Sequence, residues 1–339
     1  MDFKRAMEAE EYDFLRTNPR LGRNIILLGV GGSYAYGTDN ENSDIDFRGI
    51  TLNQPSDLLG LTVFEQYEDD KTDTVVYAFN KAVKLLLDCN PNMLEILGLD
   101  YDKYLIMNDI GRELLDNRKM FLSKRAIYSF GGYASAQLRR LQNAVARDSL
   151  PQAEREQHIY NTVMNILNDL NRKGQMWENG DMRVYIDRSD NPEFDKEIFI
   201  DVNCSHLSLR DYSNVIGTMS NAVRSYDKIG KRNKKKDDNH LNKHAMHLIR
   251  LFMMAIDILE KGEIIGYRGN DLELLLSIRR GDYLSPDRTF KQEFYDILAY
   301  YESRLKEAES RTILPDNPDM ERVERFVEYV NRRAVEGNY

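Results

Sequence analysis

The chain has 339 residues, of which 42% are hydrophobic, so it is long enough for roughly two domains with packed cores. Its 47 basic and 56 acidic residues give a formal charge of −9, which argues against a surface built for nonspecific binding to nucleic acid. The two cysteines, Cys89 and Cys204, are too few and too far apart for a disulfide framework or a cysteine zinc site. Because no apolar run approaches the ~20 residues of a membrane span, we expect a soluble cytoplasmic protein with no membrane partner.

Strand patterns are concentrated in the first third of the chain. Apolar, alternating or β-branched runs predict strands at residues 24–31, 44–52, 61–66, 73–77 and 104–107. Helical periodicity predicts two helices between the fourth and fifth strands, at residues 78–88 and 92–99. These elements predict a small mixed α/β core that ends near Lys124.

Beyond Lys124 the pattern is mainly helical. Amphipathic stretches predict helices at residues 124–147, 152–171, 207–229, 239–261, 287–309 and 319–334. Two alternating runs, at residues 183–187 and 197–202, predict a β-hairpin inserted among the helices. The predicted fold class is therefore α+β, with a small mixed-sheet core over residues 1–124 and a mainly helical domain over residues 125–339.

A glycine-rich turn and a pair of aspartates lie close together in the predicted core. An apolar run ends in Gly31-Gly32-Ser33, and the next run carries Asp44 and Asp46. Side chains at i and i+2 of a strand share a face, so the two carboxylates are expected to lie side by side. Because adjacent carboxylates repel unless a divalent cation lies between them, the pair predicts a site for Mg²⁺ or Mn²⁺. The glycines permit close approach of the backbone, and a helix capped by Ser33 would direct N–H groups at a phosphate.

Each of these two features alone is commonly an ordinary turn or a patch of surface charge. Their combination at this spacing is what indicates a functional site. If the strand is regular, Arg48 shares the face of Asp44 and Asp46 and is placed to orient a carboxylate or a phosphate. Ile45 and Phe47 then face the core.

The same glycines superficially resemble the start of a dinucleotide-binding fold. That fold requires a full crossover helix before an acidic strand end about 20 residues further on. Here only residues 33–43 separate the glycines from Asp44, which is too short for a crossover helix and its turns. The spacing therefore excludes the dinucleotide-binding interpretation.

A polar stripe marks a helix predicted in the second half of the chain. Lys243, His247 and Arg250 fall on one side of it, opposite an apolar arc. Such a stripe suits phosphates, since Arg makes forked contacts and Lys supplies a point charge. Because His240 and His244 line up with His247, zinc binding is an alternative, and a plain solvated face is another.

A basic run precedes this helix. Six of the nine residues from Lys228 to Lys236 are basic. Such a run is usually a solvated loop, but it is also suited to clamp RNA phosphates or a triphosphate tail. Both interpretations stay open.

These motifs resemble the active-site signature of the DNA polymerase β-type nucleotidyltransferase superfamily. The resemblance is carried by Gly32-Ser33, the Ala-Tyr-Gly that follows, and the run Ser43-Asp-Ile-Asp-Phe-Arg-Gly49. Within the superfamily, the chain is most similar to the RNA-ligase-associated predicted nucleotidyltransferase family. Softer similarity extends over Asn90–Leu97, Gly131–Ala134, Lys243–Leu251 and Ile278–Gly281.

The resemblance implies a metal-dependent nucleotidyltransferase that moves a nucleoside monophosphate from an NTP, such as ATP, to an acceptor hydroxyl. Residues 1–124 would be the catalytic core, and residues 125–339 would complete the nucleotide cleft. The association with RNA ligases implies an RNA end as the acceptor in a repair reaction. A protein hydroxyl is an alternative acceptor, and a non-catalytic nucleotide- or RNA-binding relative is an alternative function. The motifs indicate neither the preferred NTP nor the oligomeric state.

The resemblance also implies a third metal-binding carboxylate on a neighbouring strand. Asp73, at the start of a β-branched run, matches that position. Other acids close by are alternatives, namely Glu65, Glu68, Asp69 and Asp70.

For the nucleotide, the resemblance implies contacts from both halves of the chain. Gly32 and Ser33 would bind the β and γ phosphates. Lys243, His247 and Arg250 would contact the incoming nucleotide across the cleft, with Lys243 and Arg250 neutralising the leaving pyrophosphate.

Overall fold

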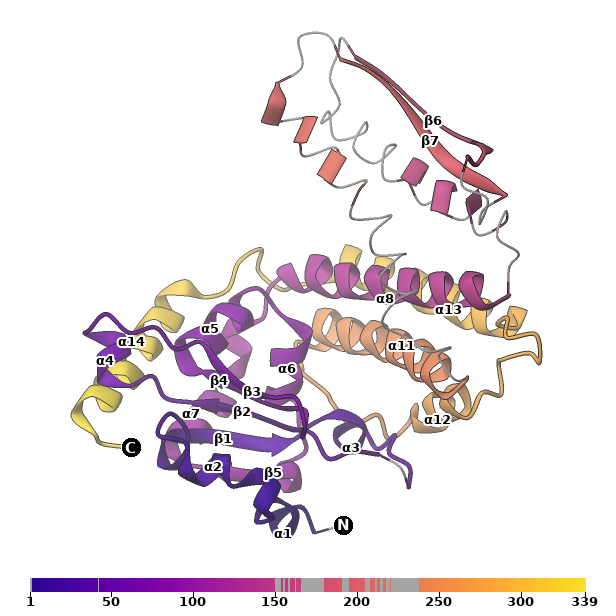
Figure 1. Cartoon of the computed structure of the whole chain (residues 1–339). Helices are drawn as coiled ribbons and strands as arrows, with labels where there is room; N and C mark the ends of the chain where they lie inside the picture. Colours follow the sequence, from indigo (N-terminus) through magenta and orange to yellow (C-terminus); the bar gives the residue numbers. More distant parts are fainter. Residues whose placement is uncertain are drawn as a thin grey trace. The chain divides into compact units, whose positions relative to one another are not determined.

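The computed structural model describes residues 2–41, 43–149, 180–190, 195–204 and 238–339, with scattered residues between 154 and 165 and between 208 and 220. It shows an α+β architecture with a five-stranded mixed sheet, a separate two-stranded sheet and a mostly helical second half (Figure 1). The predicted helices at 152–171 and 207–229 lie largely outside the described residues. The basic run at 228–236 lies entirely outside them.

The central sheet has the strand order β3-β4-β2-β1-β5. Its strands are β1 (Ile25–Val30), β2 (Phe47–Thr51), β3 (Gln66–Asp69), β4 (Thr74–Ala78) and β5 (Tyr104–Met107). β2 and β4 run parallel, whereas the other neighbouring pairs are antiparallel. This arrangement places the starts of β2 and β4 side by side, where the predicted site residues lie.

The strand expected at residues 61–66 is in the wrong place. The structure has β3 at Gln66–Asp69, and Leu61 and Val63 are exposed. The antiparallel pairing of β3 with β4 brings Asp69 opposite Thr74 across a short turn, so the turn sets the position of the strand. The apolar side chains that suggested an earlier strand have no core to pack against.

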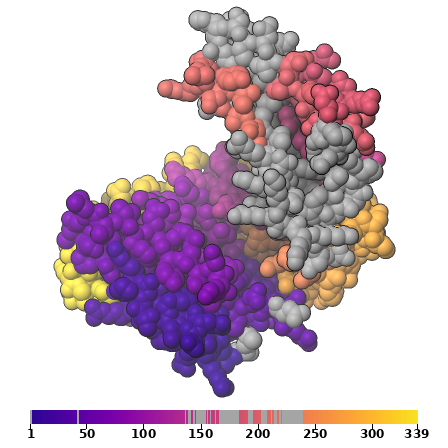
Figure 2. Space-filling model, viewed as in Figure 1, coloured from indigo at the N-terminus to yellow at the C-terminus, as the bar shows by residue number. Residues whose placement is uncertain are grey.

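Two clusters of apolar side chains cover the sheet. One joins Leu28, Val30 and Phe47 to the N-terminal helices α1 (Phe3–Met7) and α2 (Phe14–Thr17), and Ile45 packs against it as expected. The other joins the sheet to α5 (Phe79–Leu87), α6 (Pro91–Leu97), α7 (Asp109–Asp116) and α14 (Met320–Glu336). The C-terminal helix thus completes the core of the first third, and Figure 2 shows its yellow residues at the surface beside the purple ones.

Helix α6 begins at a well-defined cap. The side-chain oxygen of Asn90 accepts the N–H groups of Asn92 (3.1 Å) and Met93 (3.3 Å), and Pro91 occupies the first helical position. Asn is a favoured N-cap residue, and Pro lacks the N–H that a first turn leaves unpaired. The Asn-Pro step therefore fixes where α6 starts and places Glu95 one turn further on.

The remaining elements connect and extend this core. The helices are α3 (Gly32–Tyr36), α4 (Pro55–Leu58), α8 (Arg125–Ser149), α11 (Asp238–Lys261), α12 (Leu272–Arg280) and α13 (Gln292–Arg311). Short 3-10 turns occur at Glu10–Tyr12, Gly22–Asn24, Tyr101–Lys103 and Arg118–Phe121. The predicted hairpin is confirmed as the antiparallel pair β6 (Gly180–Arg188) and β7 (Lys196–Cys204).

The chain forms two compact units. The first contains Met1–Gln137, Ala245–Asp282 and Gln292–Tyr339, and the second contains Leu138–His244 and Tyr283–Lys291. The division at residue 124 into a catalytic core and a helical domain stays a prediction. Over the described ranges, no helix has both the length and the apolar composition that crossing a membrane requires.

Candidate functional site

The glycine-rich turn joins β1 to α3 and packs directly on Asp46. The N–H group of Gly31 donates a hydrogen bond to the carbonyl oxygen of Asp46 (2.7 Å). Gly32 has φ of +59°, a left-handed conformation that favours glycine. A β-carbon at Gly32 would lie 2.0 Å from Oδ2 of Asp46, so the absence of a side chain admits the carboxylate. Helix α3 starts at Gly32 with Gly31 as N-cap, so Ser33 lies in the first turn and the expected Ser33 cap is wrong.

The two aspartates lie in the segment just before β2, not within the strand as predicted. Asp44 is exposed and Asp46 is half-buried. Between them, the carbonyl oxygen of Ile45 accepts a hydrogen bond from the hydroxyl of Tyr12 (3.2 Å). Burial raises the pKa of Tyr12, and the negative charges of Glu11, Asp46 and Asp44 raise it further. Both carboxylates of the pair therefore act electrostatically on the same small region.

Asp73 lies at the start of β4, next to the aspartate segment. β2 and β4 run parallel, and Arg48 of β2 is opposite Val75 of β4. Asp46 lies two residues before Arg48, and Asp73 lies two residues before Val75, so the two aspartates occupy equivalent positions on neighbouring segments. Nη2 of Arg48 donates to Oδ1 of Asp73 (3.0 Å), and Nη1 donates to the carbonyl oxygen of Asp73. The Asp73 side chain is 68% exposed. As anticipated from the sequence, Arg48 contacts a carboxylate, and that carboxylate belongs to Asp73.

Two of the alternative acids have other partners. Oδ2 of Asp69 accepts hydrogen bonds from the N–H group and the hydroxyl of Thr72 (both 2.9 Å), and these bonds lower the pKa of Asp69. Glu65 pairs with Lys81 of α5 (3.2 Å). These contacts hold Asp69 and Glu65 at the β3–β4 turn and at α5, whereas Asp73 is bonded to β2. The hydrogen bonds to β2 therefore favour Asp73 over Asp69 and Glu65 as the third acid.

The oxygen donors of Asp44, Asp46 and Asp73 have the chemistry that Mg²⁺ and Mn²⁺ prefer. In the part of the chain that the structure describes, however, no three carboxylate, imidazole or thiol groups converge closely enough to hold a metal ion. The donor set thus fits a hard cation, but a cage of three carboxylates is not formed.

The polar stripe of α11 is divided in the structure. Lys243 is exposed, His247 is half-buried, and Arg250 is 1% exposed. Lys243 belongs to the second compact unit, whereas His247 and Arg250 belong to the first, which also contains the glycine turn. Arg250 therefore does not lie on a solvated face, and its predicted contact with the nucleotide stays a prediction.

The buried side chain of Arg250 contacts two residues of the glycine-turn unit. Its Nη2 donates to Oε1 of Glu95 (2.6 Å), and its guanidinium carbon lies 3.6 Å from the centroid of the Tyr36 ring. The hydroxyl of Tyr36 donates to Oε2 of Glu95.

Glu95 was assigned no role from the sequence. One feature of the sequence could have indicated Glu95: it is a single acid within an apolar run of α6. Its neighbours are all buried, namely Met93, Leu94, Ile96 and Leu97.

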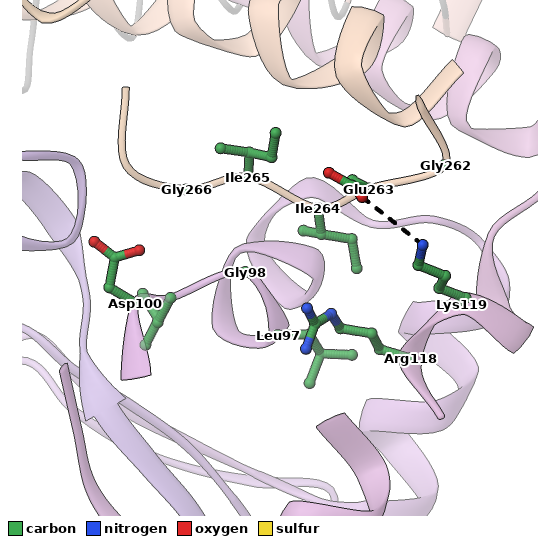
Figure 3. A pocket seen from close by; sticks show the side chains of 11 residues that line it. Leu97, Gly98, Asp100, Arg118, Lys119, Gly262, Glu263, Ile264, Ile265 and Gly266 are labelled. Atoms are coloured by element: carbon green, nitrogen blue, oxygen red, sulfur yellow. Dashed lines mark ion pairs between the residues drawn. The ribbon is translucent and has the colours of Figure 1, made fainter. Parts of the chain in front are cut away.

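A cavity of about 270 Å³ lies elsewhere on the first unit (Figure 3). It lies between the end of α6 and residues 262–266, with Lys119 and Glu263 facing one another at 3.9 Å. Its lining mixes acids, bases and apolar side chains, including Arg118 and Ile264. None of the predicted site residues lines it, so it is distinct from the turn and the aspartates.

Comparison with known proteins identifies one family. Residues 5–160 match the family model RlaP, described as the RNA repair pathway DNA polymerase beta family. This match confirms the expected resemblance, and the mixed five-stranded sheet is consistent with a polymerase β-type core. No curated protein and no solved structure matches the chain. The matched segment contains the glycine turn, the aspartate pair and Asp73, whereas Lys243, His247 and Arg250 lie beyond it.

Proposed function

We propose that the chain transfers a nucleoside monophosphate from an NTP to a hydroxyl at an RNA end. The starting point is the match of residues 5–160 to the RNA repair pathway DNA polymerase beta family. The observation that carries this proposal is the packing of the Asp46 carboxylate against Gly32. This packing sets a carboxylate, the kind of group that Mg²⁺ prefers, beside a turn of the type that suits phosphate. A pure binding module gains nothing from keeping Asp44 and Asp46 close together, since like charges disfavour each other.

In the proposed reaction, the acceptor oxygen forms a bond to the α-phosphorus of the NTP. The bond from that phosphorus to pyrophosphate breaks, and the hydroxyl proton passes to solvent. Bound Mg²⁺ or Mn²⁺ would supply charge neutralisation on the triphosphate and a lowered pKa of the attacking hydroxyl. Asp44 and Asp46 are the residues proposed to hold it, with Asp73 as the third carboxylate.

The glycine turn is proposed to bind the β and γ phosphates. The first N–H groups of a helix have no partner within the helix, and they favour an anion. Gly32 and Ser33 supply such groups, and Ser33 adds a hydroxyl. Lys243 and His247 are proposed as further contacts to the nucleotide.

The acceptor can be identified directly. The chain is incubated with each of the four NTPs, ATP included, radiolabelled at the α-phosphate, with Mg²⁺ or Mn²⁺. Acceptors are RNA oligonucleotides with free or blocked terminal hydroxyls, and a protein mixture. We expect label on RNA with a free hydroxyl and none on blocked RNA.

Matched variants test whether labelling depends on the aspartate pair or is equally sensitive to an exposed aspartate elsewhere. Asp44→Asn and Asp46→Asn should abolish labelling, whereas Asp102→Asn, at a side chain 75% exposed in the 3-10 turn before β5, should not. Label on protein alone would support the AMP-transferring alternative. NTP binding with no labelled product under any condition would support a non-catalytic relative.

A further inference from the structure

Three segments far apart in the sequence each supply one side chain to a single buried network. Tyr36 ends α3, Glu95 lies in α6, and Arg250 lies in α11 (labelled in Figure 1). The two carboxylate oxygens of Glu95 are divided between the partners, because Tyr36 donates to Oε2 and Arg250 donates to Oε1. The Arg250 guanidinium also stacks on the Tyr36 ring. Each member of the network therefore contacts both others.

Tyr36 and Arg250 each keep one charge state around neutral pH. Burial raises the pKa of Tyr36 well above its usual value, and Glu95 adds to this, so the phenol stays protonated and donates. Burial lowers the pKa of Arg250, but the charge and hydrogen bond of Glu95, with Tyr36, more than offset this, so the net change is upward and the guanidinium stays charged. A guanidinium has no acceptor, so Nδ1 of His247, 2.9 Å from Nη2 of Arg250, accepts. The hydrogen-bond directions of the network are thus fixed.

Arg250 depends on both parts of the tyrosine side chain. Its Nε and Nη1 atoms are buried and have no hydrogen-bond partner among the described residues. The face of the Tyr36 ring compensates this buried charge through a cation–π contact. The hydroxyl of Tyr36 meanwhile orients the carboxylate of Glu95 that pairs with Arg250. Because Tyr36 belongs to α3, its side chain connects the network to that helix.

Helix α3 needs such an external support. It has five residues, and a helix this short is not stable in isolation. At its start, Gly31 is bonded to the carbonyl oxygen of Asp46, and at its end Gly37 takes a left-handed conformation with φ of +73°. Tyr36 lies between these points, at the C-terminal end of α3, so its anchored side chain restrains the helix.

We propose that Glu95 and Arg250 are positioning residues that act through Tyr36 on the Gly32–Ser33 turn, an assignment that rests on the proposed function. In this assignment Arg250 does not touch the nucleotide. It holds the turn in the geometry in which it binds the β and γ phosphates, on which negative charge grows as pyrophosphate leaves. Loss of the anchor therefore affects the chemical step more than nucleotide affinity.

Tyr36→Phe is the sharpest variant, because it removes one hydroxyl and keeps the ring beneath Arg250. Its matched control is Tyr104→Phe, since the hydroxyl of Tyr104 also donates to α6, at the carbonyl oxygen of Ile96 (2.8 Å), without touching α3. Tyr36→Phe should lower kcat roughly ten- to a hundredfold, as expected for a misplaced reacting group. KM for the NTP should stay within about twofold, because ground-state binding is unchanged. Tyr104→Phe should lower the melting temperature similarly and leave kcat unchanged.

A second measurement tests the link between the network and the turn without relying on enzymatic activity. Amide hydrogen exchange over residues 31–37, measured without substrate, should be faster in Tyr36→Phe than in wild type, and unchanged in Tyr104→Phe. Unchanged exchange with unchanged kcat would overturn the positioning role. If wild type transfers no nucleotide in any condition while exchange responds as expected, the proposed function fails and the mechanical link between the network and the turn stands.

Arg250→Lys and Glu95→Gln distinguish positioning from direct contact with the nucleotide. Positioning predicts that both variants lower kcat with little change in KM, since they disturb the same anchor. A raised KM in Arg250→Lys alone, with kcat unchanged, would show that Arg250 binds phosphate directly and would overturn the assignment. If either variant unfolds, Tyr36→Phe still decides the question.

Discussion

The carboxylate of Asp46 occupies the space that a side chain at Gly32 would fill, with Oδ2 only 2.0 Å from the ideal position of a β-carbon. The same two segments are joined through their backbones by the hydrogen bond from Gly31 to Asp46. An acidic group and the turn that we propose to bind phosphate are thus held together before any ligand arrives. Preorganisation of this kind avoids the cost of rearrangement at the moment of reaction.

Gly32→Ala should therefore slow nucleotidyl transfer strongly while leaving a folded protein. The new methyl group meets Asp46 and forces a left-handed conformation that alanine adopts at a cost of about 1–2 kcal/mol. We expect kcat to fall by roughly two orders of magnitude, because the carboxylate must move away from the turn. The measurement is the rate of labelled product formation at saturating NTP.

Gly131→Ala provides the matched control for this substitution. Gly131 lies in α8, and a β-carbon there has no neighbour within 4 Å. Alanine at a helical position stabilises by roughly 0.5–1 kcal/mol relative to glycine. Thermal unfolding should thus show a stabilised Gly131→Ala with normal activity. Activity that survives equally in Gly32→Ala would show that the turn does not contribute to the site.

Asp73→Asn should lower transfer activity strongly, whereas Asp69→Asn should not. Asp73 accepts a hydrogen bond from Arg48 beside the aspartate segment, whereas Asp69 accepts one from Thr72 within the β3–β4 turn. Titrating the activity of each variant with Mn²⁺ separates the two roles, since a lost ligand raises the metal concentration required. Equal metal curves for Asp73→Asn and wild type would exclude Asp73 as the third carboxylate.

The sequence was sufficient for elements whose burial follows a local pattern. All six residues of β1 are buried, as its continuous apolar run indicated, and the alternation at β6 and β7 correctly indicated a hairpin. β3 was misplaced because a turn determines its position. Helix α7 was not predicted, because its eight residues have few apolar positions and it is fixed by the cap at Asn108.

Within the site, too, contacts between residues close in the sequence could be predicted, whereas contacts between distant residues could not. The turn and the aspartates are about a dozen residues apart, so spacing alone brought Gly32 and Asp46 together in the prediction. Arg250 and Glu95 are separated by 155 positions. Periodicity showed that Arg250 lies on a polar side of its helix, but no local pattern encodes which carboxylate that side meets. The alternative of a plain solvated face is therefore wrong for Arg250, which is buried.

Acid should remove the stabilisation that Asp69 provides. Hydrogen bonds from the N–H group and hydroxyl of Thr72 lower the pKa of Asp69 below its usual value. A carboxyl whose pKa is lower in the folded state stabilises that state above the unfolded pKa of about 3.9, and the gain disappears as the pH falls through the folded pKa. The difference in unfolding free energy between wild type and Asp69→Asn should thus be largest above about pH 5 and shrink toward pH 3. Urea unfolding across this range measures it, and a difference that grows on acidification would contradict the assignment.

Asp257→Ala should destabilise the protein far more than removal of a surface ion pair. Asp257 and Arg268 are 8% and 5% exposed, and Nη1 of Arg268 donates to Oδ2 of Asp257. Without the carboxylate, the bond to the carbonyl oxygen of Ile265 (2.7 Å) is the one that the buried guanidinium keeps among the described residues. An uncompensated buried charge costs about 3–5 kcal/mol. Arg280→Ala breaks an exposed pair with Glu273 and should cost only about 0–1 kcal/mol. Denaturant unfolding of both variants tests the contrast, and similar losses in the two would show that Arg268 finds another partner once Asp257 is removed.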